Sequence, residues 1–144
     1  MKLVIDDWID LELKDYLLSQ DGIESVDIIS KYYVNEINIE YNEKITPSIV
    51  MKYIELFQND KYPILVSFDK NENEDYKTLK YTVKDMCCEY CYMGLVYDLF
   101  DNKYIKSVKS DFDFASPAFD VEFTIEYDKN YNEEELIKFL DEKK

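Results

Sequence analysis

The chain has 144 residues, 47% of them apolar and 16% aromatic, which excludes a disordered chain and allows one ordinary domain or two small ones. A formal net charge of −15 repels phosphate backbones, so we expect no nucleic-acid ligand. No stretch approaches the ~20 apolar residues of a membrane span, and the N-terminus lacks the basic start and long apolar run of a signal peptide. These features predict a cytoplasmic protein without a membrane partner.

The first half of the chain predicts the element order strand, helix, strand, strand, helix, strand. Apolar or alternating runs predict the strands, and apolar side chains spaced three to four apart, such as Trp8 and Leu11, predict the helices. Thr46 and Pro47 mark the start of the second helix, as a capping residue followed by proline at the first helical position. The predicted elements span residues 3–5, 8–20, 23–28, 37–41, 47–58 and 62–68.

The second half repeats this order as far as its second helix. Residues 69–76 are polar, charged and without periodicity, so they mark the boundary between a module at 1–70 and a module at 77–144. Asn132 is the predicted cap of the last helix, whose first residues are acidic, as the helix dipole favours. The predicted elements span residues 79–83, 92–102, 105–108, 119–127 and 133 onwards.

The two halves can be aligned along their middle strands. Residues 23–26 (Ile-Glu-Ser-Val) match residues 105–108 (Ile-Lys-Ser-Val) at an offset of 82, and residues 37–42 match residues 123–128 at an offset of 86. The second half therefore has four additional residues between these strands, placed around residues 112–117. The alignment indicates an internal duplication.

This element order is the split βαβ, or ferredoxin-like, arrangement, in which a four-stranded antiparallel sheet carries two helices on one face. We therefore predict an α+β fold of two ferredoxin-like βαββαβ modules in tandem. The second module lacks its last strand, which leaves an open sheet edge along residues 79–83. Exposed edges invite pairing, so we expect the first module or a partner copy in a homodimer to cover this one.

The three cysteines, Cys87, Cys88 and Cys91, lie within five residues, between a predicted strand and a predicted helix. An odd number packed this tightly does not suit a disulfide framework, but it suits a metal or redox site in a reducing compartment. Two thiols three residues apart at a helix start can point toward one ion, and the free amides there favour the thiolate that binds metal. Soft sulfur ligands select Cu(I), Zn(II) or related ions.

The loop resembles that of the heavy-metal-associated (HMA) domain family of copper chaperones, mercury-binding proteins and metal-transporting P-type ATPases. The family motif Gly-Met-Thr-Cys-x-x-Cys is matched by residues 85–91, Asp-Met-Cys-Cys-Glu-Tyr-Cys, with Asp85 in place of glycine. The family pattern Gly-Val-x-x-Val is matched by residues 104–108, with Tyr104 in place of glycine, and Val-x-Ile-x-Tyr-Asp by residues 123–128. The resemblance covers roughly residues 79–140.

The resemblance implies that Cys88 and Cys91 are metal ligands and that Met86 is a buried anchor of the loop. Cys87, with or without Glu89, would raise the coordination toward Zn(II), which prefers four ligands, whereas Cu(I) needs only two or three thiolates. The implied function is that of a cytosolic carrier or sensor of Cu(I) or Zn(II). Its implied partner is a metal-transporting ATPase or another protein with a basic surface. The first module has no cysteine and would be degenerate.

Other readings of these residues stay open. The cysteines can be small buried side chains, or a thiol–disulfide pair, and the acidic chain can mimic nucleic acid as an inhibitor. A non-enzymatic interaction scaffold that uses the acidic surface or the open sheet edge is the principal alternative to metal binding. The chain has no histidine and only two glycines, so imidazole chemistry and glycine-rich phosphate loops are excluded, and we predict no enzyme.

Overall fold

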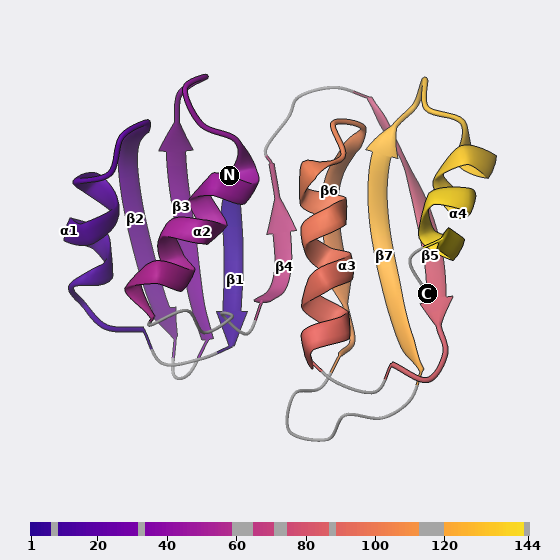
Figure 1. Ribbon diagram of the computed structural model, residues 1–144, viewed down its shortest axis with the longest axis horizontal. Helices are drawn as coiled ribbons and strands as arrows, with labels where there is room; N and C mark the ends of the chain where they lie inside the picture. Colours follow the sequence, from indigo (N-terminus) through magenta and orange to yellow (C-terminus); the bar gives the residue numbers. More distant parts are fainter. Residues whose placement is uncertain are drawn as a thin grey trace. The chain divides into compact units, whose positions relative to one another are not determined.

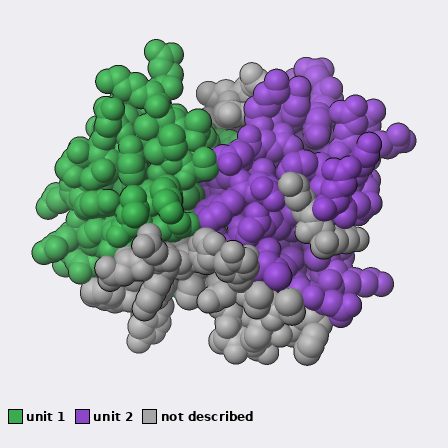
Figure 2. All heavy atoms as spheres, in the orientation of Figure 1, with its two compact units in different colours: residues 1–70 green, residues 71–144 purple. Residues whose placement is uncertain are grey.

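The computed structural model describes residues 1–6, 9–31, 34–58, 65–70, 75–86, 89–112 and 120–142. These residues form seven strands and four helices, and every strand pairing within a unit is antiparallel, which confirms a mixed α+β chain. The chain divides into two compact units, Met1–Lys70 and Asn71–Lys144, which Figure 2 colours separately. No helix in the described ranges is long and apolar enough to cross a membrane.

Unit 1 has the strand order β2-β3-β1-β4, and its two helices lie on one face of these strands (Figure 1). Leu3 of β1 and Ile37 of β3 are paired and fully buried beneath the helices, whereas Val4, which points to the opposite face, is half-buried. The rings of Tyr16 and Phe57, 5.2 Å apart, join the two helices. The elements are β1(Lys2–Asp6), α1(Leu13–Leu18), β2(Ile23–Lys31), β3(Val34–Tyr41), α2(Pro47–Phe57) and β4(Leu65–Asp69).

Unit 2 has the strand order β6-β7-β5 and keeps its core on one side of the central strand, β7. The residues of β7 on that side, Val121, Phe123, Ile125 and Tyr127, are all buried, while Glu122 on the other face is exposed. Leu136 and Leu140 of α4 are also buried. The elements are β5(Tyr76–Val83), α3(Glu89–Asp101), β6(Ile105–Ser110), β7(Val121–Asp128) and α4(Glu133–Glu142).

The hairpins β2–β3 and β6–β7 are paired in equivalent register. Val26 pairs with Ile39, and Val108 pairs with Ile125, so the offsets of 82 and 86 that align the sequences also relate the paired residues. Each hairpin has its irregularity at the same place, one residue after its first pair. Eight residues separate Ile28 from its partner Ile37, and twelve separate Ser110 from its partner Phe123. The four additional residues thus belong to the β6–β7 connection, of which residues 113–119 lie outside the described ranges.

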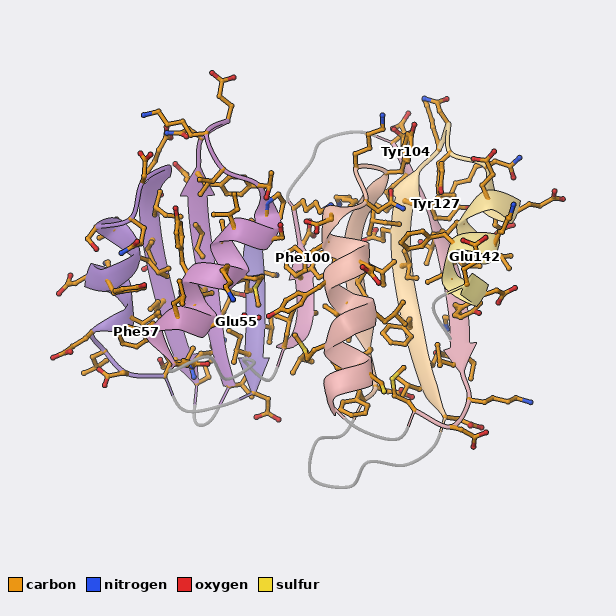
Figure 3. The ribbon with its side chains drawn as sticks, viewed as in Figure 1. Glu55, Phe57, Phe100, Tyr104, Tyr127 and Glu142 are labelled. Atoms are coloured by element: carbon orange, nitrogen blue, oxygen red, sulfur yellow. The ribbon has the colours of Figure 1, made fainter. Side chains whose placement is uncertain are left out.

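The position at which the HMA motif has glycine is occupied by different residues in the two units, Gly22 and Tyr104. Gly22 has a φ of +90°, and a Cβ built on it would lie 2.7 Å from Cγ2 of Ile45. At the equivalent place in unit 2, the ring of Tyr104 stacks on that of Tyr131 at 4.3 Å, and Figure 3 shows Tyr104 at the start of β6. The hydrogen bond at this place is kept, since the Asn42 amide donates to the Gly22 carbonyl at 2.9 Å and the Asp128 amide to the Tyr104 carbonyl at 2.8 Å. The backbone conformation differs, because Gly22 has a positive φ and Tyr104 does not. A change in backbone conformation, together with a paired change in two side chains, therefore accompanies the loss of the glycine.

The first helix is shorter than its sequence pattern predicts. It begins at Leu13 rather than at residue 8, because the Asp10 side chain accepts the Glu12 amide at 2.9 Å and holds residues 10–12 in a turn. Leu11 was expected to face the core and is instead 91% exposed, so that prediction is wrong; Trp8 lies outside the described residues. The predicted cap of α4 is confirmed, since Asn132 Oδ1 accepts the Glu134 amide at 2.8 Å.

The two glycines offer a matched pair of alanine substitutions. Gly22→Ala places a side chain at positive φ against Ile45 and should lower the free energy of unfolding by about 1–3 kcal/mol. Gly94→Ala is the control: Gly94 is an exposed residue of α3 with no atom within 4 Å of an added Cβ, so the change should raise stability by about 1 kcal/mol. Urea unfolding of both variants measures the difference, and equal effects would contradict the Gly22 geometry.

Candidate metal-binding loop

The loop that carries the cysteines starts with a sharp change of backbone direction after β5. Val83 ends the strand as a buried residue, and Asp85, two positions later, has a φ of +58°. This left-handed conformation favours glycine, and aspartate is one of the few other residues that adopt it at modest cost. Asp85 stands where the family motif has glycine, so the replacement keeps the backbone conformation that glycine would favour.

Met86 is the second fixed point of the loop. Only 5% of its surface is exposed, although it follows an exposed left-handed residue and lies outside any helix or strand. A buried thioether fills an apolar gap and is not available to an ion at the surface. The structure therefore confirms that Met86 is buried, as the resemblance implies.

Helix α3 presents Cys91 on its exposed side. The helix begins at Glu89, which places Cys91 in the first turn, and the Cys91 side chain is exposed. The next two residues, Tyr92 and Met93, are buried, and the buried arc continues along the helix through Leu95, Val96, Leu99 and Phe100. Cys91 therefore lies outside the apolar arc that attaches α3 to the rest of unit 2, which disfavours the reading of this cysteine as a small core residue.

Tyr92 fixes the first turn of α3 against the sheet. Its hydroxyl lies 2.5 Å from the Ser110 hydroxyl, and its ring stacks on Phe112 at 4.3 Å and on Phe123 at 5.7 Å. Burial raises the pKa of Tyr92 to about 12. The sequence pattern alone assigned no core packing role to this tyrosine. The signal was its spacing of four and seven residues from Val96 and Leu99, which puts it on the apolar side of the helix.

The predicted ligands Cys87 and Cys88 lie outside the described residues, so the structure places only Cys91 of the three. In the part of the chain that is described, no three or more Cys, His, Asp or Glu side chains come together to hold a metal ion. A ligand set at this loop would thus depend on Cys87 or Cys88 joining Cys91. Thiolates in this loop have the chemistry to ligate a soft ion at the protein surface.

In the described residues of unit 1, no helical turn corresponds to the turn that carries Cys91. Helix α1 has 6 residues and α3 has 13. At the offset of 82, the buried Leu13 and Leu17 of α1 correspond to Leu95 and Leu99 of α3, so α1 matches only the second half of the longer helix. The turn that carries Cys91 is therefore specific to unit 2.

The left-handed residue can be tested by substitution. Asp85→Val should lower the free energy of unfolding by about 1–2 kcal/mol, because a β-branched side chain is strongly disfavoured at positive φ, while Asp85→Gly should cost nothing. Lys84→Val is the matched control, since Lys84 is a neighbouring exposed residue without positive φ. Thermal and urea unfolding measure the effects, and similar costs for the two valine variants would argue against the left-handed turn.

Burial of Tyr92 predicts a loss of stability at high pH. The pKa of about 12 in the folded protein exceeds the value of about 10 in an unfolded chain, so the folded state holds this proton more tightly. The contribution is fully present below pH 10 and is lost as pH rises toward 12, by up to about 3 kcal/mol. Tyr92→Phe removes this titration, so the stability difference between wild type and variant should fall between pH 10 and 12. A constant difference would show that Tyr92 is not buried.

Comparison of the chain with protein-family models, with characterised proteins and with solved structures gave no match. The resemblance to the HMA family therefore stays a prediction that rests on the residues of the loop and of the strands β6 and β7.

Proposed function

We propose that the protein binds a soft transition-metal ion, Cu(I) or Zn(II), through Cys88 and Cys91 with the participation of Cys87, as a non-enzymatic carrier or sensor. The observation that carries the proposal is the exposure of Cys91 in the first turn of a helix whose next two residues are buried. A carrier must hold its ion where a partner can reach it, and an exposed thiol at a helix start meets that requirement.

The surroundings of the loop support the proposal because they are rigid on both sides of the cysteines. Asp85 turns the chain and Met86 anchors it before the cysteines, while Tyr92 anchors it immediately afterwards. A segment held at both ends loses little conformational entropy when it closes around an ion. The ion would be cargo, and the thiols must stay reduced, which suits the cytoplasm.

The choice between the two ions depends on Cys87. Two thiolates satisfy Cu(I), and a third raises the number of ligands toward the four that Zn(II) prefers. No histidine is present anywhere in the sequence, so the fourth ligand for Zn(II) would be a carboxylate or water. Loss of Cys87 should therefore weaken Zn(II) binding more than Cu(I) binding.

We also infer that both units are ferredoxin-like modules derived from one ancestor, with modules at residues 1–70 and 77–144. The inference is supported by the order β2-β3-β1-β4 in unit 1, the order β6-β7-β5 in unit 2, and the equivalent register of their hairpins. Unit 1 has no cysteine and lacks the extra helical turn, so it acts as a scaffold.

Metal titration of the reduced, purified chain tests the proposed function. We expect about one ion per chain with a dissociation constant tighter than about 1 μM, measured by competition with chromophoric Cu(I) and Zn(II) chelators. The double variant Cys88→Ser/Cys91→Ser should lose binding because serine hydroxyls are poor ligands for soft ions. Cys87→Ser is the matched control, which should retain Cu(I). Binding that is weaker than micromolar in the wild type, or unchanged in the double variant, would remove the proposal.

A further inference from the structure

Within the described residues, strand β5 has a strand neighbour on one side only. Among the described residues it pairs with β7, and it forms the end of the strand order in unit 2 (Figure 1). In unit 1, by contrast, β1 pairs with β3 on one side and with β4 on the other. Strand β1 of unit 1 therefore has a strand on each side, whereas the outer side of β5 has no strand in the described part of unit 2.

The strands β1 and β5 occupy equivalent positions in their units. Leu3 pairs with Ile37, and Tyr81 pairs with Phe123. Ile37 and Phe123 are related by the offset of 86, so Leu3 and Tyr81 are equivalent. Lys2 pairs with Asn38 in the same way that Lys80 pairs with Thr124. Lys80 is thus the equivalent of Lys2, and the side of β1 that pairs with β4 corresponds to the outer side of β5.

Apolar side chains on β5 are less buried than their equivalents on β1. Leu3 is fully buried and Met1 nearly so, while the equivalent Tyr81 and Leu79 are only half-buried. All four lie on the helix-covered face of their strands. An added strand beside β5 would bury more of Leu79 and Tyr81, and this burial provides a hydrophobic driving force for docking.

The positive charge of β5 favours an added strand that carries acidic residues. The strand carries Lys77 and Lys80 and no acidic residue, although the chain as a whole has a net charge of −15. Lysines on an edge strand ordinarily discourage pairing with a neutral or basic strand. In unit 1, however, Asp69 of β4 lies opposite Lys2 in the strand register, so the strand that fills this place has an acidic residue across from the lysine. Lys2 itself forms an ion pair with Glu36 of β3 at 3.6 Å. Within the described residues Lys80 has no ion pair.

We propose that the outer edge of β5 binds an extended acidic segment of a partner protein as an added antiparallel strand. Unit 1 supplies the pattern: an acidic residue opposite Lys80 and apolar residues opposite Tyr81 and Val83, as Asp69, Phe68 and Leu65 lie opposite Lys2, Leu3 and Ile5. Main-chain hydrogen bonds would provide affinity, and the carboxylate would provide selectivity. A second copy of the chain fits less well, because β5 itself has no carboxylate to offer.

Binding of a synthetic peptide to the full chain tests the proposal. The probe is a fluorescently labelled peptide with the sequence of residues 64–69, Ile-Leu-Val-Ser-Phe-Asp, and its control has lysine in place of the aspartate. We expect saturable binding below about 1 mM, weakened about tenfold in the control peptide, by fluorescence anisotropy. Hydrogen exchange should show protection of the β5 amides.

Charge reversal in the protein supplies the matched variants. Lys80→Glu should weaken binding of the aspartate peptide about tenfold and restore binding of the lysine peptide. Lys109→Glu is the control, since Lys109 of β6 pairs with the same Thr124 from the other side of β7, away from the edge.

Absence of binding, equal effects of the two variants, or protection at β1 instead of β5 would overturn the proposal. A dimer that is lost in Lys80→Glu would overturn it in favour of a second copy. All readouts are made without metal, so the outcome is independent of the cysteines.

Discussion

The position of Cys91 in the first turn of α3 depends on the burial of Tyr92 between α3 and the strands β6 and β7. Burying such a side chain contributes about 2–3 kcal/mol, and its stacking on two phenylalanines adds roughly 0.5–1.5 kcal/mol each. The left-handed conformation of Asp85 costs only about 1–2 kcal/mol. The free energy gained by burying Tyr92 therefore outweighs the conformational cost at Asp85. With Tyr92 held against the strands, Cys91, one residue earlier in α3, stays exposed.

The two units keep the same hairpin hydrogen bond with different side chains and a different backbone conformation at one position. The carbonyl at Gly22 and that at Tyr104 accept equivalent hydrogen bonds, so the pairing of the hairpins does not require glycine. The side chain that packs against this position differs between the units in a matching way. Ile45 leaves no room for a Cβ on Gly22, whereas the ring of Tyr131 stacks on the ring of Tyr104. The departure from the family pattern at Tyr104 is therefore compensated locally.

The strands and most helix boundaries could be predicted because alternation and capping are local signals. The alternating residues of β7 and the cap at Asn132 are where the sequence pattern places them. Leu11 was misplaced because its spacing fits a helix, whereas the side chain of Asp10 closes a turn that competes with the helix. The spacing of Tyr92 indicates that it lies on the apolar side of α3, but its partners Ser110 and Phe123 could not be predicted, because only the tertiary fold brings them to it. Of the candidate ligands, only Cys91 lies in the described residues.

Strand β5 connects the two proposals physically. It carries Lys80 at its edge and ends at Val83, two residues before the turn at Asp85 that leads into the cysteines. Val83 is buried and pairs with Val121 of β7, so the pairing of β5 within unit 2 fixes the point from which the chain turns toward Cys91. The same strand thus has two separate roles: its inner side positions the loop, and its outer side is the proposed binding edge.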